Sequence, residues 1–272
     1  MEEGQAATIW GLIDAELVTF PVVAQELNAA VVTFSVPLEA AETALASDAF
    51  QVVEADDGVD VVLVLFEYRR GDWAPCNSLD IAFPVRPVGG GRRGLYMCPT
   101  LVSHPFNSEA AYWTMGVSRS VGDIKVSVDD GTVTFAARNP GCHATTIRLP
   151  RGEVPAPRQL WSTRAYTSIG GQGYAVPFEM ELPSRPLDVS EVSITLGTGP
   201  LADTLRMLGL PAPATFASWA EGLTGTFHQG QPVGELSSPA QAPEPTTSAD
   251  GDGSSPADGA SPRAPTRSSQ PH

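Results

Sequence analysis

The chain has 272 residues, of which 42% are hydrophobic, and a formal net charge of −15. This length suits one large domain or two small ones, and the apolar share is enough for a substantial core. The acidic balance argues against nucleic acid or an anionic membrane as a partner. The acidic start Met1-Glu2-Glu3 does not fit a signal peptide, and the longest apolar run, Val59–Phe66, is too short to cross a bilayer. We therefore expect a cytoplasmic protein.

Most of the chain reads as strands, with apolar runs or alternating apolar and polar residues between turn signals. The clearest turn is Asp129-Asp130-Gly131, which predicts a hairpin. Three segments with helical spacing interrupt the strands. The predicted strands are Ala29–Val36, Val59–Arg70, Asn77–Pro87, Leu95–Val102, Asp123–Val128, Thr132–Arg138, Cys142–Leu149, Gln159–Ile169, Tyr174–Leu182 and Val189–Leu196. The predicted helices are Leu38–Ser47, about Asn107–Arg119, and Pro200–Leu208.

These elements predict an α+β fold, mainly antiparallel β, in the form of a barrel-like domain with a few inserted helices. We place this domain at residues 15–228, after an N-terminal extension at residues 1–14. Residues 229–272 are rich in Pro, Ser and Ala and have almost no large apolar residue after Leu236. Such a composition cannot bury enough surface to offset its ordering entropy, so we predict a disordered tail.

Metal and phosphate sites are not indicated. The cysteines Cys76, Cys98 and Cys142 are too few and too scattered for a disulfide framework or a CxxC site. The four histidines show no HxxxH or HxH spacing, and the glycines form no GxxxxGK[ST] loop. We therefore predict no metal and no cofactor.

Lys125 is the single lysine, and all the other strongly basic residues are arginines. Arginine supplies a positive charge, but only lysine can become neutral and attack a carbonyl group. Lys125 is therefore a candidate for covalent chemistry, and the alternative is a solvated surface lysine. Strand alternation places it opposite the apolar side chains of Ile124 and Val126. That second face would be solvent in an ordinary sheet and could be a cavity in a barrel.

Two segments resemble acetoacetate decarboxylase. Residues 68–78 match, without a gap, the family stretch that runs Tyr-Arg through Asp to Pro-Tyr-Asn-Glu. Residues 115–125 are similar to the segment in which a helix runs into a short aromatic-Pro-Lys motif, whose lysine forms a Schiff base. The resemblance extends from about Phe20 to Phe227. It implies the family's barrel-like fold and makes Lys125 the Schiff-base residue.

Several expected site positions depart from the family. Ser78 stands where the family has glutamate, and Cys76 where it has tyrosine. Gln25 stands about where the family's pocket arginine falls, and Val126 replaces a second lysine. Without that arginine and acid, binding of a substrate carboxylate and proton handling are weaker, which disfavours plain acetoacetate decarboxylation.

Three further residues are candidates for the site. Asp80 is on the same strand face as Ser78 and could supply a displaced carboxylate, or it is a solvated strand aspartate. Glu67 on the preceding strand is a comparable candidate. Arg119 could lower the pKa of a nearby amine, or it stabilises a helix C-terminus. Gln25, Glu67, Cys76, Ser78, Asp80 and Arg119 are thus the predicted substrate-binding residues; Cys76 is alternatively a small buried side chain.

The resulting hypothesis is a cofactor-independent lyase-type enzyme that acts on a keto acid or related carbonyl compound, such as a secondary metabolite. Lys125 would form the Schiff base for decarboxylation, aldol-type condensation, dehydration or cyclisation. The alternative is a non-catalytic small-molecule-binding barrel that has lost the decarboxylase site. A third hypothesis is an interaction module that presents the acidic tail. Assembly as a homo-oligomer stays open.

Overall fold

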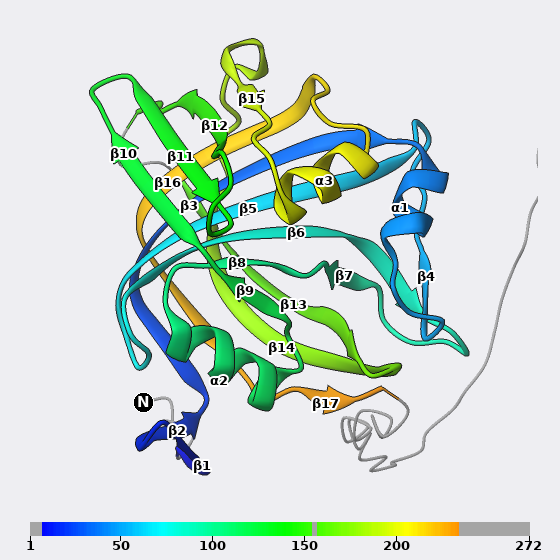
Figure 1. Ribbon diagram of the computed structural model, residues 1–272, viewed down its shortest axis with the longest axis vertical. Coiled ribbons are helices and arrows are strands. Elements are labelled where there is room, and N and C mark those ends of the chain that lie inside the picture. Colours follow the sequence, from blue (N-terminus) through cyan, green and yellow to red (C-terminus); the bar gives the residue numbers. More distant parts are fainter. Residues whose placement is uncertain (1–6, 154–156, 234–272) are drawn as a thin grey trace, which may run out of the picture. The chain divides into compact units, whose positions relative to one another are not determined.

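The computed structural model describes residues 7–153 and 157–233, and its centre is a closed barrel of seven strands (Figure 1). The strands follow the order β5–β3–β16–β14–β13–β7–β6, and pairing between β5 and β6 closes the circle. Pairing of β7 with β13 is parallel, and the other barrel pairs are antiparallel. The bounds are β3 Val22–Val36, β5 Val59–Gly71, β6 Cys76–Pro87, β7 Gly94–Met97, β13 Arg158–Ile169, β14 Gln172–Pro183 and β16 Ala214–Phe227.

A second, four-stranded sheet lies beside the barrel with the order β10–β11–β12–β15. Its strands are β10 Asp123–Val128, β11 Thr132–Arg138, β12 Thr145–Pro150 and β15 Ser193–Thr195. In Figure 1 this sheet, α1 (Leu38–Ala44) and α3 (Pro200–Met207) lie on one side of β3, β5 and β6. Together they enclose the largest hydrophobic core, to which Phe135, Ile147 and Leu205 contribute.

The alternation of β5 and β6 divides their side chains between two environments. Leu63 and Leu65 on β5, and Leu79 and Ile81 on β6, are fully buried in the large core. The intervening residues face the barrel interior, where Phe66 and Asp80 lie. The face of β6 that carries polar residues is therefore inside the barrel and not in solvent, because both faces of this strand are covered.

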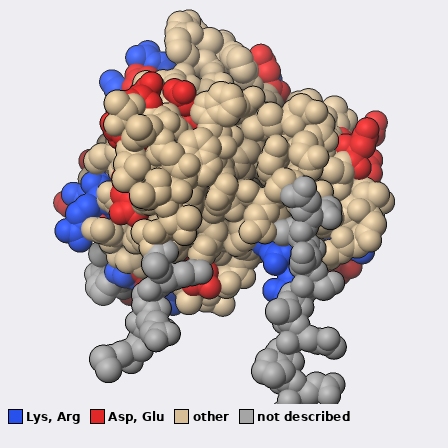
Figure 2. Space-filling view, turned by 90° about the horizontal axis from the view of Figure 1, so that it is seen from below, with Lys and Arg blue, Asp and Glu red and all other residues tan. Residues whose placement is uncertain are grey.

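The opposite side of the barrel carries α2 (Pro105–Met115) and the hairpin of β1 (Thr8–Ile13) and β2 (Glu16–Phe20). Phe106 and Ala110 of α2 pack there with Val18 of β2. Seen from below in the orientation of Figure 1, this side consists mostly of uncharged side chains (Figure 2). Exposed large apolar or aromatic residues on these elements are Ile9, Trp10, Leu12, Leu17, Tyr112 and Trp113.

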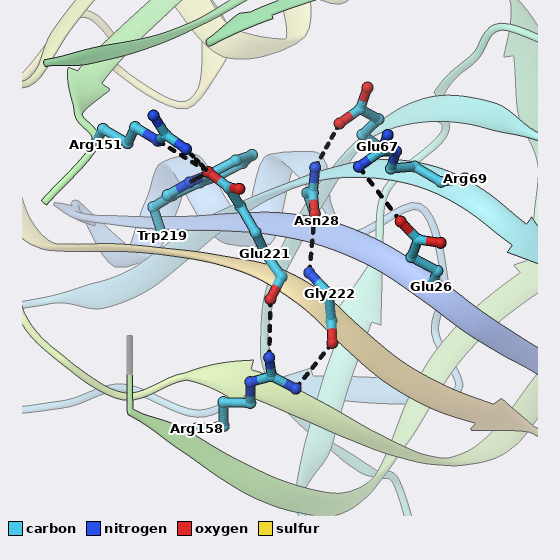
Figure 3. Close-up of polar contacts among 9 residues, drawn as sticks. All are labelled: Glu26, Asn28, Glu67, Arg69, Arg151, Arg158, Trp219, Glu221 and Gly222. Atoms are coloured by element: carbon cyan, nitrogen blue, oxygen red, sulfur yellow. Dashed lines mark hydrogen bonds and ion pairs between the residues drawn. The ribbon is translucent and has the colours of Figure 1, made fainter. Parts of the chain in front are cut away.

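A β-bulge in β16 is held by a polar cluster (Figure 3). Gly222 has φ = +65°, a left-handed conformation that favours glycine. Its N–H donates to Asn28 Oδ1 at 3.0 Å, and its carbonyl oxygen accepts from Arg158 at 2.8 Å. Asn28 in turn donates to Glu67 Oε2 at 2.6 Å. The bulge thus ties β3, β5, β13 and β16 together.

The fold class is confirmed, and the bounds of β10 and β11 agree with the predicted strands. Four differences are clear. Residues 8–13, expected in an extension, form β1; β16 was not predicted; and the segment Val189–Leu196 contains a 3₁₀ turn before β15. In the predicted tail, Gln231–Pro232 form β17, which pairs with β14, while residues 234–272 lie outside the described part of the chain. The remaining strands are β4 Phe50–Val52, β8 Thr100–Val102 and β9 Arg119–Val121.

None of the helices in the described ranges is long and apolar enough to cross a membrane.

Candidate ligand-binding cavity

The barrel encloses a cavity of about 130 Å³ with mostly apolar walls. Strands β3, β5, β6, β13 and β14 supply these walls, and α2 contributes Asn107 and Met115. The apolar lining includes Val64, Phe66, Ala82, Ala165, Val176, Phe178 and Met180. Such a space is comparable to the engineered apolar cavity of 150 Å³ that binds benzene. The fold therefore offers a site for a ligand of about that size.

One charged pair, Asp80 with Arg119, interrupts the apolar wall. Asp80 is fully buried, and the Arg119 side chain is 15% exposed. Arg119 donates from Nε to Asp80 Oδ1 at 3.1 Å and from Nη2 to Oδ2 at 3.2 Å. Burial alone lowers the pKa of Arg119, but the Asp80 carboxylate reverses this and raises the pKa above its ordinary value. Arg119 therefore stays a cation inside the barrel.

Two hydroxyl groups complete the environment of Asp80. Ser78 Oγ donates to Oδ2 at 2.9 Å, and Thr100 Oγ1 donates to Oδ1 at 3.0 Å. Ser78 comes from the same strand face two residues earlier, and Thr100 begins the neighbouring strand β8. The carboxylate thus accepts four hydrogen bonds from three side chains, which is how a buried charge is stabilised.

The cavity wall next to this pair holds groups that are neutral near pH 7. Burial raises the pKa of the Cys76 thiol to about 11, although Arg119 acts in the opposite direction. Asn107 Nδ2 donates to Cys76 Sγ at 3.0 Å. Burial also raises the pKa of Tyr68 above its ordinary value, again with Arg119 opposing. Cys76 is therefore a buried thiol with little thiolate character, as its alternative interpretation predicted.

Lys125 does not line this cavity. The prediction that it lies in the barrel interior is wrong, because β10 belongs to the four-stranded sheet and not to the barrel. Ile124 is buried against the large core, so alternation turns the exposed Lys125 to the solvent face of the same strand. Lys125 is therefore a solvated surface lysine, which was the alternative interpretation from the sequence.

The other predicted residues divide into two groups. Cys76, Asp80 and Arg119 line the cavity, and Ser78 is bonded to Asp80. Gln25 is exposed and is not part of the lining. Glu67 also lies away from the cavity, in the polar cluster with Asn28 (Figure 3). Glu67 lies between Phe66 and Tyr68 in β5, so alternation along the strand places it on the opposite face.

Two alternative interpretations from the sequence are also wrong. Asp80 is not a solvated strand aspartate, since its side chain is fully buried. Arg119 does not stabilise a helix C-terminus, because α2 ends at Met115 with Gly116 as its left-handed cap, at φ = +71°. The early end of α2 frees Val117 and Ser118 as a short connection, and Arg119 then starts β9 beside β8.

Solved structures with a similar fold are known for this architecture. No family model and no curated protein matches the chain. A solved structure from "Structural Studies of Acetoacetate Decarboxylase" has a TM-score of 0.58 and 11% identity, covering 78% of this chain and 89% of that one. The chain has the acetoacetate decarboxylase-like fold.

Two further structures with this fold are similar. An acetoacetate decarboxylase-like enzyme from Sphingomonas wittichii RW1 has a TM-score of 0.53 and 13% identity. The match covers 84% of this chain and 98% of that enzyme. The enduracididine biosynthesis enzyme MppR, complexed with pyruvate, has a TM-score of 0.55 and 14% identity at the same coverage. At these identities the comparison establishes the fold and leaves the chemistry to the residues of the site.

The decarboxylase resemblance can now be placed on the structure. The family motif has a lysine in a three-residue segment that follows a helix directly. Here the helix is α2, and after its cap Gly116 the chain continues Val117-Ser118-Arg119. Arg119 is the first basic residue after α2, and Lys125 lies six residues further on. The cap glycine was the signal in the sequence that could have shown that Arg119 lies beyond the helix.

Proposed function

We propose that the chain is a small-molecule-binding barrel that does not form a Schiff base in its cavity. The observation that carries this proposal is that the cavity's buried cation is Arg119, closed onto Asp80. Arginine cannot lose its proton in a protein and cannot form an imine with a carbonyl compound. The described residues that line the cavity include no lysine.

The proposed ligand is a small, mostly apolar molecule. Apolar walls and a few placed polar groups are typical of small-molecule sites. Similar folds bound to pyruvate, and to a condensation product of pyruvate in another MppR structure, support a small-molecule ligand as well.

Binding can be tested with toluene as a probe of the cavity. The Ala82→Leu variant places a larger side chain into the lining, and we expect toluene binding measured by calorimetry to fall at least about tenfold. The matched control is Ala136→Leu, which makes the same enlargement on β11 outside the cavity and should leave binding unchanged. If toluene fails to bind the native protein, or binds the Ala82→Leu protein equally well, the cavity is not the binding site.

The second candidate function is a carbon–carbon lyase that uses Lys125 as a Schiff base on a keto acid. The enzyme names of the similar structures favour it. Incubation with pyruvate or acetoacetate, reduction with borohydride and mass spectrometry separate the two candidates, because Lys125 is the single lysine and the α-amino group can be blocked. We expect no adduct. An adduct that disappears in Lys125→Arg, together with turnover of the keto acid that disappears with it, would establish the enzyme and overturn the binding-only proposal.

A further inference from the structure

At the polar end of the cavity, Asp80 has no free acceptor site, whereas its partner Arg119 has a free donor. Asp80 already accepts from Ser78, Thr100 and twice from Arg119, and a carboxylate has about four lone-pair sites. Nothing on Asp80 is left for a ligand. Arg119 Nη1, by contrast, donates to no atom of the described residues, and the arginine side chain is partly exposed. A guanidinium has donors only, so a ligand group that binds Arg119 must be an acceptor.

The charge of this end is already balanced. Asp80 neutralises Arg119 at hydrogen-bond distance, and the surrounding walls are apolar. A carboxylate ligand at Arg119 would therefore lose its hydration and add a net negative charge next to Asp80. An uncharged oxygen acceptor avoids both costs. Arg70 also contributes to the lining, but it is exposed and water screens its charge.

We infer, on the basis of the binding function proposed above, that the cavity selects an uncharged carbonyl compound over a carboxylate of the same size. The carbonyl oxygen accepts from Arg119 Nη1, and the apolar body packs against residues such as Phe66 and Phe178. The volume of about 130 Å³ suits a single six-membered ring, and the partly exposed Arg119 receives the small carbonyl substituent. Asp80 holds the guanidinium in place and does not touch the ligand.

Three ligands of nearly equal size test this selection by isothermal titration calorimetry on the full chain. Acetophenone carries the neutral carbonyl, benzoate replaces its methyl group by a charged oxygen, and α-methylstyrene replaces the carbonyl oxygen by carbon. We expect acetophenone to bind at least about tenfold tighter than either of the others, which is the range of one hydrogen bond to a charged group.

Variants assign the preference to the ion pair. In the double variant Asp80→Asn/Arg119→Met, which leaves no unpaired buried charge, the advantage of acetophenone over α-methylstyrene should disappear. The matched double variant Asp123→Asn/Arg138→Met removes an exposed ion pair at 2.8 Å outside the cavity and should retain the preference. Thermal unfolding of each protein shows whether it is folded.

The outcomes separate two kinds of failure. Benzoate that binds as tightly as acetophenone, or a preference that survives in Asp80→Asn/Arg119→Met, would overturn the selection and leave small-molecule binding in place. If none of the three ligands binds, the proposed binding function itself is wrong, and the selection fails with it.

Discussion

Replacement of Arg119 by methionine should destabilise the protein strongly, because it leaves a buried charge without its partner. Asp80 is fully buried and would keep only the hydroxyl groups of Ser78 and Thr100. Breaking a buried ion pair in this way typically costs about 3–5 kcal/mol of the free energy of unfolding. Asp80→Asn should cost less, about 1.5–3 kcal/mol, because the guanidinium left without its partner is partly exposed and still faces the cavity.

The double variant Asp80→Asn/Arg119→Met should be more stable than the sum of the single costs predicts. Removing both charges together leaves no uncompensated ion, so we expect a coupling energy of at least about 2 kcal/mol. The exposed pair of Asp123 with Arg138, whose side chains are 43% and 51% exposed, provides the control cycle. Its coupling should be about 0.2–1 kcal/mol.

Urea unfolding at pH 7, followed by circular dichroism, gives the free energies for both cycles. Additive costs at Asp80 and Arg119, or a cost below about 1 kcal/mol for Arg119→Met, would show that water reaches the carboxylate. The description of Asp80 as a saturated, buried acceptor would then be incorrect, and the ligand selection inferred from it would lose its basis.

Three other outcomes are expected. Gly222→Ala should cost about 1–2 kcal/mol in urea unfolding because of its left-handed backbone, whereas Gly131→Ala in an open turn should be neutral to within about 0.5 kcal/mol. Burial raises the pKa of Cys98 from 9.0 to about 12, so above pH 9 the unfolded chain loses a proton that the folded chain keeps. Stability should fall by about 1.4 kcal/mol more per pH unit in the native protein than in Cys98→Ala, and equal slopes would contradict this. Arg119→Lys in a Lys125→Arg background should give a borohydride adduct with acetoacetate that Lys125→Arg alone lacks; its absence would show that the position cannot react with a carbonyl.

The sequence predicts strands best where a local pattern carries the information. Strands β10 and β11 flank a clear Asp-Asp-Gly turn, and their bounds were predicted to the residue. The alternation of β6 also gave the correct division of its two faces. Strand β16 was missed because it combines small residues with Gly222 and Gly225 and therefore lacks a continuous β-branched or aromatic run. Its pairing with β3, about 190 residues earlier, stabilises the strand that its local sequence preference does not predict.

The site was harder to predict because its geometry depends on which strands close the barrel. Alternation correctly separated Lys125 from Ile124, but it could not decide whether the opposite face was cavity or solvent. That choice depends on pairing between distant segments, which left β10 in the separate sheet. Arg119 was named as a site residue, although the helix was extended through it. Gly116, which ends α2 three residues earlier, turns that arginine from a helix position into a cavity position.

A second property of the cavity, besides the identity of its cation, supports the binding function proposed above. General acid–base catalysis needs a group that reaches the ligand and whose pKa lies near the working pH. Asp80 has its lone pairs filled, Arg119 keeps its proton, and burial raises the pKa of both Cys76 and Tyr68. The described lining contains no histidine. By closing onto Asp80, Arg119 forms a fixed pair of charges at the polar end of the cavity that can orient an acceptor but does not exchange a proton with it.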